Sequence, residues 1–301
     1  MGHTMKNNPL VYVVTPVFNS REHTRAFLSS LKKQSYKNFR VVIVDDGSTD
    51  GTDEMVNKFF PEVILIKGNG KLWWSGGTNL GVKRAIKDKA DFVITINDDV
   101  VIAKQYVRSL VECAKLNPSS LIGSKIVYKD DKNKVWYAGA DFDVKTGNLK
   151  HRMGKLSDFS GTVESEWLTG MGVMIPIEVF KKVGLYNEKE YPQYFGDADF
   201  SLRAKTAKYK LLVNNDIFLV SDLKSNWLDR SLSKPKISFV KDLFFSKRSP
   251  YQISKRFKFY KKYWPGNKIR PLYRLYLFEM VPIYRSWLIQ YIRKIKNRGN
   301  S

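Results

Sequence analysis

Asn97, Asp98 and Asp99 are the residues whose chemistry stands out first in this sequence. They directly follow the apolar run 92–96, which predicts a buried strand. Adjacent carboxylates at the end of a buried strand repel each other and lose hydration, so they are expected to need a cation. Carboxylate and amide oxygens suit Mg²⁺ or Mn²⁺, and these ions commonly hold substrate phosphates. The alternative is a solvated turn, because Asn and Asp favour turns in any case.

Asp197 and Asp199 form a second acidic pair, at the start of an expected helix that runs to about Tyr209. A carboxylate in the first turn of a helix is favoured by the free backbone N–H groups and by the helix dipole. From this position alone, capping of the helix and acid–base chemistry are equally expected roles for Asp197.

The alternation of apolar runs and helical patterns predicts the elements that position these residues. Strands and helices follow one another at a spacing typical of an α/β fold with a mostly parallel sheet and helices on both faces. The expected strands are 10–14, 39–44, 63–66, 92–96, 167–176 and 211–220, with extended segments at 121–128 and 135–138, and the expected helices are about 21–34, 53–59, 76–89, 103–116 and 194–209.

Three polar loops, 15–19, 45–50 and 97–99, follow expected strands. Ligands of parallel sheets bind outside the carboxyl ends of the strands, so we expect these loops to converge on one crevice that suits a phosphate-bearing ligand. A dinucleotide site would need Gly-x-Gly-x-x-Gly after the first strand, where this chain has Thr-Pro-Val-Phe-Asn. A nicotinamide-dependent dehydrogenase is therefore excluded.

The composition describes a globular protein of 301 residues with 43% apolar and 14% aromatic side chains. The single cysteine, Cys113, excludes a disulfide framework and a cysteine-rich zinc site. The first residues lack the apolar core of a secretion signal, so we expect the protein in the cytoplasm.

Basic residues are concentrated from Ser231 to the end, where 18 Lys and Arg stand against two acidic residues, a net +16 out of +23. Aromatic and cationic residues are interleaved there, and the uncharged runs are far shorter than the roughly 20 residues that span a bilayer. Such a segment suits the surface of an anionic membrane, with a helical lid or a dimer face as the alternative. Binding nucleic acid through this tail would leave residues 10–225 without a role.

Four motifs in this order resemble those of the family 2 glycosyltransferases with a GT-A fold, and the resemblance covers residues 10–225. The stretch 71–81, Lys-Leu-Trp-Trp-Ser-Gly-Gly-Thr-Asn-Leu-Gly, is similar to the bacterial rhamnosyltransferase and galactofuranosyltransferase branch, which builds surface polysaccharides from nucleotide sugars. The four motifs are Thr15-Pro-Val-Phe-Asn19, Val44-Asp-Asp-Gly-Ser-Thr-Asp50, Asn97-Asp-Asp99 and Gly196-Asp-Ala-Asp199.

The resemblance implies a role for several single residues. Asp46 would accept a hydrogen bond from a pyrimidine ring N–H, and Asp99 would bind the metal that bridges to the diphosphate. Packing and tight turns are the alternative for the other positions. The donor nucleotide would also contact Pro16, Phe18, Asn19, Asn97 and Asp98; the donor sugar or diphosphate would lie near Trp73, Trp74, Gly76, Gly77 and Asn79; and the acceptor would lie near Thr169, Gly170, Gly172 and Asp199.

Asp197 matches the catalytic base of inverting members of this family. Inverting transfer needs a base for the acceptor proton and a cation for the departing nucleoside diphosphate. Many members carry a metal-binding His downstream of the base, where this chain has Asp222 as the substitute ligand. The three histidines, none of them in a motif, are His3, His23 and His151, which leaves a carboxylate as the base.

We therefore expect a GT-A domain at residues 5–230 and a basic helical region at 231–301. The expected protein is a Mn²⁺- or Mg²⁺-dependent inverting glycosyltransferase at the inner face of the cell membrane, with no nucleic-acid partner. It would move a sugar from a UDP- or dTDP-sugar to a glycan or a lipid-linked acceptor, and the tail is also a candidate homodimer face. Two other functions stay open: nucleic-acid binding through the tail, and nucleotide-sugar binding without turnover, which the missing His suggests.

Overall fold

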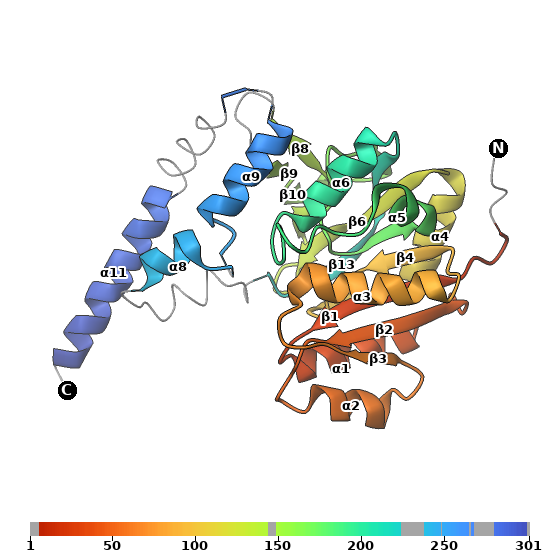
Figure 1. Cartoon of the computed structure of the whole chain (residues 1–301), viewed down its shortest axis with the longest axis horizontal. Helices are drawn as coiled ribbons and strands as arrows, with labels where there is room; N and C mark the ends of the chain where they lie inside the picture. The colour runs from red at the N-terminus through yellow and green to blue at the C-terminus, as the bar shows by residue number, and fades with distance from the viewer. Residues whose placement is uncertain are drawn as a thin grey trace. The chain divides into compact units, whose positions relative to one another are not determined.

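The computed structural model of the chain describes residues 6–143, 149–223, 238–247, 249–264, 266–267 and 280–299 (Figure 1). The chain divides into two compact units. The first unit comprises residues 1–141 and 151–222, and the second comprises residues 142–150 and 223–301. The predicted boundary at residue 231 lies outside the described residues.

The first unit begins with four parallel strands built from buried, mostly β-branched residues. β1 pairs with β2 and with β4, and β2 pairs with β3, all in parallel. The predicted strands and helices of this half are confirmed, with shifts of a few residues at their ends. In chain order they are β1 (Val11–Val17), α1 (Arg21–Lys32), β2 (Phe39–Asp45), α2 (Thr52–Phe59), β3 (Ile64–Lys67), α3 (Trp73–Lys87) and β4 (Phe92–Thr95).

The second half of this unit extends the same sheet. β12 runs antiparallel between β4 and β6, and β13 lies parallel to β6. Seven of the eleven strands, β1–β4, β6, β10 and β13, point the same way, so the predicted mostly parallel α/β sheet is confirmed. The remaining elements are β5 (Val100–Ile102), α4 (Tyr106–Leu116), β6 (Ser120–Tyr128), β7 (Lys134–Tyr137), β8 (Ala140–Phe142), β9 (Leu149–His151), β10 (Gly154–Lys155), η1 (Leu156–Asp158), β11 (Thr162–Glu164), β12 (Val173–Pro176), α5 (Ile177–Val183), α6 (Gly196–Thr206) and β13 (Lys210–Ser221).

The strand predicted at 167–176 is shorter than expected. Gly172 has φ +76°, outside the extended region, so β12 begins only at Val173. Residues 167–172 therefore form a loop, and this loop lies where the sheet meets the candidate site.

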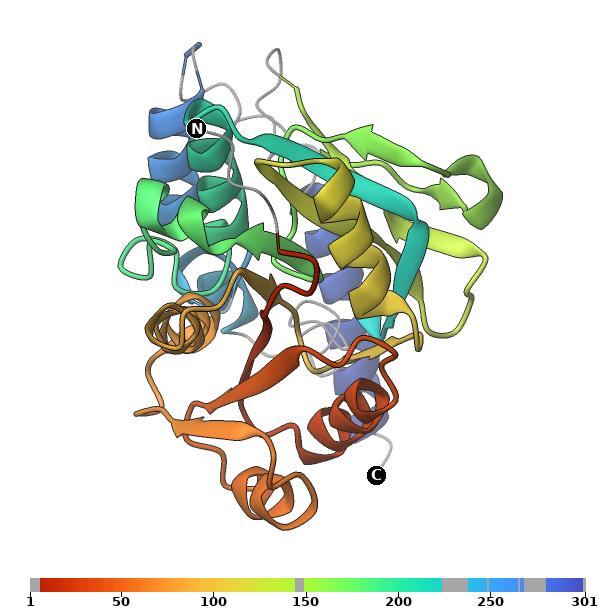
Figure 2. The ribbon, with the colours of Figure 1, turned by 90° about the vertical axis from the view of Figure 1, so that its right-hand side faces the viewer.

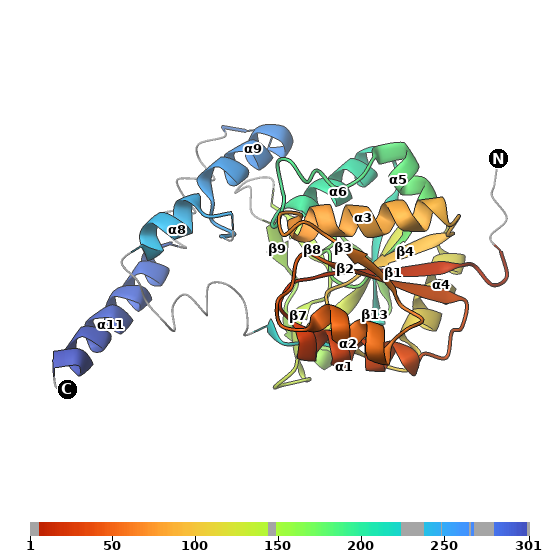
Figure 3. The same ribbon diagram turned by 60° about the horizontal axis from the view of Figure 1, so that its bottom comes forward.

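Helices cover both faces of the sheet, as predicted. α3, α5 and α6 lie on one face, and α1 and α4 lie on the other (Figures 2 and 3). α3 approaches β1 closely because it carries glycines toward the strand: a Cβ on Gly77 would come within 2.7 Å of the Pro16 Cβ, and one on Gly81 would overlap the Val14 side chain. This packing brings the first turn of α3 to the carboxyl end of β1.

The second unit contains parts of β8 and β9 and, after residue 223, the helices α8 (Phe239–Phe245), α9 (Ile253–Tyr263) and α11 (Met280–Gly299). Phe239 and Leu243 of α8 form an apolar cluster with Ile283, Tyr284 and Trp287 of α11. Within the described ranges, no helix combines the length and the apolar character needed to cross a bilayer.

Candidate active site

The polar loops predicted to converge do meet at the carboxyl edge of the parallel strands. The first loop binds the second, since the Asn19 backbone N–H donates to Ser48 Oγ at 2.9 Å. It also binds the third, since Ser20 Oγ donates to Asp98. The loop before β12 reaches the same edge, because the Gly172 N–H donates to the Thr95 carbonyl at 2.8 Å.

Asp99 has the features expected of a cation ligand more clearly than any other residue of these loops. Its Oδ1 is shielded from solvent and has no hydrogen-bond partner, which is rare for a carboxylate oxygen. Burial, and then the charges of Asp98 and Asp222, raise the pKa of Asp99 to about 6. A divalent cation would remove both costs, so the residues present fit a metal.

Asp222 lies next to Asp99, and its backbone N–H donates to the Asp99 carbonyl at 3.2 Å. Its carboxylate is about one third exposed and lies 3.7 Å from the Lys129 ammonium. No group of three or more His, Cys, Asp or Glu side chains in the described part of the chain is arranged to hold a metal. This set of one or two carboxylates suits Mg²⁺ or Mn²⁺, which also take ligands from substrate phosphates.

Asp98 is held by hydroxyl groups of the first loop and α1. Its Oδ2 accepts hydrogen bonds from Ser20 Oγ and, at 2.7 Å, from Thr24 Oγ1, both near the start of α1. The geometry thus assigns Asp98 to anchoring α1, and it gives no support to the predicted contact with the nucleotide.

Asp46 holds a loop, although the resemblance implied a contact with the nucleobase. Its Oδ1 accepts the backbone N–H of Gly70 at 2.8 Å, and its Oδ2 accepts those of Leu72 and Trp73 at 2.8 and 3.0 Å. A pyrimidine N–H would have to share these oxygens, so the predicted contact is untested.

The other predicted nucleotide contacts lie beside the first loop. Phe18 is 53% exposed and available to a ring, whereas Pro16 is half-buried against Gly77. Asn19, at φ +49°, accepts the Thr49 backbone N–H at 2.8 Å and so joins the first two loops.

The residues predicted near the donor sugar divide into two groups. Gly76, Gly77 and Asn79 are buried. The Asn79 amide binds both the carbonyl and the N–H of Tyr186, at 2.9 and 3.0 Å, so these three positions pack α3 against its neighbours. Trp73 and Trp74 are half-buried at the start of α3, where they can face a ligand.

Asp197 lies in the first turn of α6, and its Oδ2 accepts the Gly170 backbone N–H at 3.0 Å. Its Oδ1 accepts the Ala198 backbone N–H at 2.9 Å. Burial raises the pKa of Asp197, and these two hydrogen bonds oppose the rise. The structure therefore brings two of the predicted site residues, Asp197 and Gly170, into direct contact.

The remaining predicted acceptor contacts are less accessible. Thr169 is buried and its Oγ1 lies 3.4 Å from the Met171 backbone N–H. A Cβ on Gly172 would overlap Tyr106, so this glycine serves a tight turn. Sequence analysis also missed His23, an electrostatic neighbour of Asp98 and Asp99 in the first turn of α1. Its place four residues after Asn19, the last residue of the first polar loop, was the available signal.

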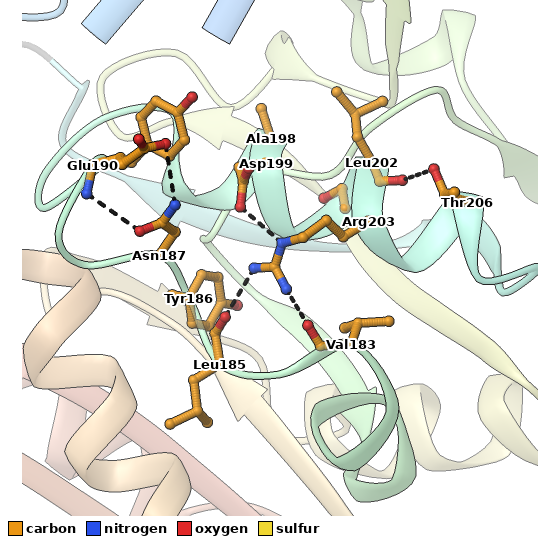
Figure 4. A network of polar contacts seen from close by, with 12 residues as sticks. Val183, Leu185, Tyr186, Asn187, Glu190, Ala198, Asp199, Leu202, Arg203 and Thr206 are labelled. Carbon is orange, nitrogen blue, oxygen red and sulfur yellow. Dashed lines mark hydrogen bonds and ion pairs between the residues drawn. The ribbon is translucent and has the colours of Figure 1, made fainter. Parts of the chain in front are cut away.

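Asp199 is fully buried and bound to Arg203, which counts against the predicted contact with the acceptor (Figure 4). Arg203 Nε lies 2.9 Å from Asp199 Oδ2, and its other nitrogens donate to the carbonyls of Val183 and Leu185. This network fastens α6 to the loop that follows α5 and thereby holds the first turn of α6, where Asp197 lies.

Replacing Arg203 with methionine is expected to destabilise the protein by about 3–5 kcal/mol, because Asp199 would remain buried without its cation. Denaturant unfolding followed by circular dichroism measures the loss. Lys205→Met is the matched control: it removes an exposed ion pair with Glu166 on the same helix and should change stability by less than about 1 kcal/mol. Equal losses in the two variants would contradict the structural role of Arg203.

Comparison with known proteins adds sequence and fold similarity to this geometry. The family model described as "Glycosyl transferase family 2" matches residues 12–181. The glycosyltransferase GlyG of Streptococcus pneumoniae is 22% identical over 220 residues, which cover 71% of this chain and 69% of GlyG. The succinoglycan biosynthesis protein ExoA of Rhizobium meliloti is 27% identical over 213 residues, covering 69% of this chain and 62% of ExoA.

Three further similarities extend this set. A Campylobacter jejuni GalNAc(5)-diNAcBac-PP-undecaprenol beta-1,3-glucosyltransferase is 22% identical over 193 residues, covering 63% of this chain and 57% of that protein. The crystal structure of GalNAc-T7 with UDP, GalNAc and Mn²⁺ superposes with a TM-score of 0.57 at 14% identity, covering 72% of this chain and 44% of that one. Staphylococcus aureus TarS gives a TM-score of 0.52 at 17% identity, covering 71% of this chain and 37% of TarS.

Proposed function

This chain belongs to the family 2 glycosyltransferases, and from that premise we propose that it transfers a sugar from a UDP- or dTDP-sugar with inversion at the anomeric carbon. The family, the enzyme class and the GT-A fold expected from the four motifs are confirmed. The family match lies within residues 12–181, outside the basic tail, and so favours the enzyme over a nucleic-acid-binding protein.

The observation that carries the proposal is the Asp197 carboxylate, held by the Gly170 N–H at the edge where the polar loops meet. In the proposed step the acceptor hydroxyl oxygen attacks the anomeric carbon, the bond from that carbon to the diphosphate oxygen breaks, and Asp197 takes the hydroxyl proton. The nucleoside diphosphate leaves with the electron pair of the broken bond. Burial raises the pKa of Asp197, which makes this carboxylate a stronger base than an exposed aspartate and suits it to accept that proton.

Asp99, together with Asp222, would hold Mn²⁺ or Mg²⁺. When bound, such an ion neutralises the charge of the departing diphosphate. The orphaned Oδ1 of Asp99 supports this assignment, and Mn²⁺ with UDP in the GalNAc-T7 structure supports it by analogy of fold.

We place the enzyme in the synthesis of a surface polysaccharide, with a glycan or a lipid-linked glycan as acceptor. ExoA is a succinoglycan biosynthesis protein, and the Campylobacter relative acts on an undecaprenol-linked glycan. These similarities support the proposed class of acceptor. The donor sugar is identified by the screen described next.

A screen of UDP- and dTDP-sugars tests the proposed function. Purified protein with Mn²⁺ is incubated with each donor, and release of UDP or dTDP is measured with and without soluble glycoside acceptors. We expect metal-dependent release with at least one donor and inversion of its anomeric configuration by NMR. Retention of configuration would overturn the assignment of Asp197 as the base in a single displacement.

Exposed residues of α11, in the second unit, support the proposal that the protein associates with an anionic membrane. Val281, Leu288 and Ile292 of α11 are 56%, 50% and 45% exposed, share one face of the helix by their spacing, and do not belong to the cluster with α8. Arg285 is exposed on the same face. An apolar stripe beside a cation suits the interface of a bilayer that carries acidic lipids.

Changing Val281, Leu288 and Ile292 together to serine is expected to weaken binding to phosphatidylglycerol-containing vesicles by about tenfold or more. The variant has less apolar surface to transfer from water into the membrane. Vesicle co-sedimentation measures the effect. Leu116→Ser is the control, since Leu116 is 83% exposed at the end of α4 in the first unit. If wild-type protein ignores vesicles but dimerises in solution, and the triple variant is monomeric, the stripe is a dimer face.

A further inference from the structure

Trp74 is fixed in the site by contacts with three residues from two separate loops. Its indole Nε1–H donates to Asn97 Oδ1 at 2.9 Å, and its backbone N–H donates to Gln193 Oε1 at 3.3 Å. The Tyr186 ring meets the indole edge to face, with centroids 5.1 Å apart. The indole is therefore held by the loop after β4 and by the loop that precedes α6.

Gly170 lies directly against the Trp74 ring. A Cβ at residue 170 would overlap Cζ2 and Cη2 of the indole, so only glycine fits beside it. The N–H of the same Gly170 donates to the Asp197 carboxylate at 3.0 Å. Three consecutive contacts thus join Asn97, on the donor side, to Asp197, on the acceptor side.

We propose that Trp74 is a positioning residue that couples the donor loop at Asn97 to the orientation of Asp197. This inference rests on the proposed function, because it assigns Asn97 to donor binding and Asp197 to proton removal. Interiors are close-packed, so a shift of Asn97 on donor binding moves the indole, and the indole moves the Gly170 backbone. The base then takes its working orientation when the donor is bound.

The pH dependence of transfer reports on the Gly170–Asp197 contact. The N–H of Gly170 stabilises the ionised carboxylate, so losing it raises the pKa of Asp197 and moves the acid limb of the rate profile to higher pH. The ionisable groups that face Asp197 from other elements are Tyr137 and Tyr186, and burial raises the pKa of both. Asp199, on the same helix, is paired with Arg203.

The test compares Trp74→Phe with Trp74→Leu, at saturating Mn²⁺. Phenylalanine keeps a ring against Gly170 but lacks the N–H for Asn97, whereas leucine lacks both. We expect both variants to weaken UDP binding in the presence of Mn²⁺ several-fold by calorimetry, because Asn97 loses its partner. Trp74→Leu, which also loses the ring against Gly170, should lower kcat by about tenfold and shift the acid limb to higher pH by about one unit. Trp74→Phe, which breaks only the link to Asn97, should change both in the same direction but by less.

Trp136→Phe and Trp136→Leu are the matched controls, since Trp136 is a half-buried tryptophan of the same unit that packs on His151. They should leave UDP affinity and the acid limb unchanged. A wild-type acid limb in Trp74→Leu, or a larger change in Trp74→Phe than in Trp74→Leu, would overturn the coupling. Absence of transfer activity in the wild-type enzyme would instead count against the proposed function. In that case UDP binding still tests the coupling, and wild-type UDP affinity in Trp74→Phe would overturn it.

Discussion

Asp197→Asn is expected to lower the rate of sugar transfer by about 10²- to 10⁴-fold, the usual loss when a general base is removed. Asparagine keeps the size of the side chain and an oxygen for the Gly170 N–H, so the loop before β12 should stay in place. The substitution removes the capacity to accept a proton and the hydrogen bond from the Ala198 backbone N–H, because the amide nitrogen cannot accept it. UDP affinity in the presence of Mn²⁺, measured by calorimetry, should remain within a few-fold of wild type.

Asp199→Asn provides the contrast. Asp199 is buried on Arg203, so its loss should lower the stability of the protein, and the folded fraction should still transfer sugar. Full turnover in Asp197→Asn with loss of turnover in folded Asp199→Asn would show that the base is misassigned.

The rate of transfer should fall as the pH is lowered, with a midpoint above the ordinary Asp value of 3.8. Burial raises the pKa of Asp197, so its carboxylate becomes protonated at a higher pH than that of an exposed Asp. The same shift predicts that ionised Asp197 costs stability once the pH rises through its folded pKa. Asp197→Asn should therefore be at least as stable as wild type at neutral pH, as thermal unfolding would show.

The sequence identifies where the acidic residues lie but not how each of them is used. Asp98 and Asp99 are neighbours with the same side chain, and only the folded chain places Ser20 and Thr24 against Asp98 and leaves Asp99 Oδ1 without a hydrogen-bond partner. These partners lie more than 70 positions away, so no local pattern predicts them. Asp199 and Arg203 are different, because a pair four residues apart on a helix is visible in the sequence as a structural ion pair.

The fold likewise has a part that local patterns predict and a part that depends on long-range pairing. The apolar runs that form β1, β2 and β4 predict the parallel half of the sheet, because burial on both faces makes such strands continuously apolar. The antiparallel insertion of β12 between β4 and β6 depends on long-range pairing that periodicity does not report. The function of Asp46 was hidden for a similar reason, since the N–H groups it binds belong to a loop more than 20 residues further on.

Asp99→Ala is expected to abolish the dependence of UDP binding on Mn²⁺. The metal strengthens diphosphate binding by neutralising charge, a contribution of several kcal/mol in metal-dependent sites, so affinity should fall at least about 100-fold to the metal-free value. Calorimetry with UDP, with and without Mn²⁺, measures this directly. An unchanged gain from Mn²⁺ in the variant would show that Asp99 is not a ligand.

The apo protein distinguishes this loss from unfolding. Asp99 Oδ1 has no hydrogen-bond partner, and its charge is opposed by Asp98 and Asp222, so removing the carboxylate relieves repulsion. Asp99→Ala should therefore unfold at the wild-type temperature or above it in the absence of metal. Asp98→Ala should unfold at a lower temperature, because Ser20 and Thr24 lose their acceptor. Protein donors thus satisfy the carboxylate of Asp98 and leave an oxygen of the neighbouring Asp99 unpaired. This arrangement is expected when the second carboxylate binds a cation.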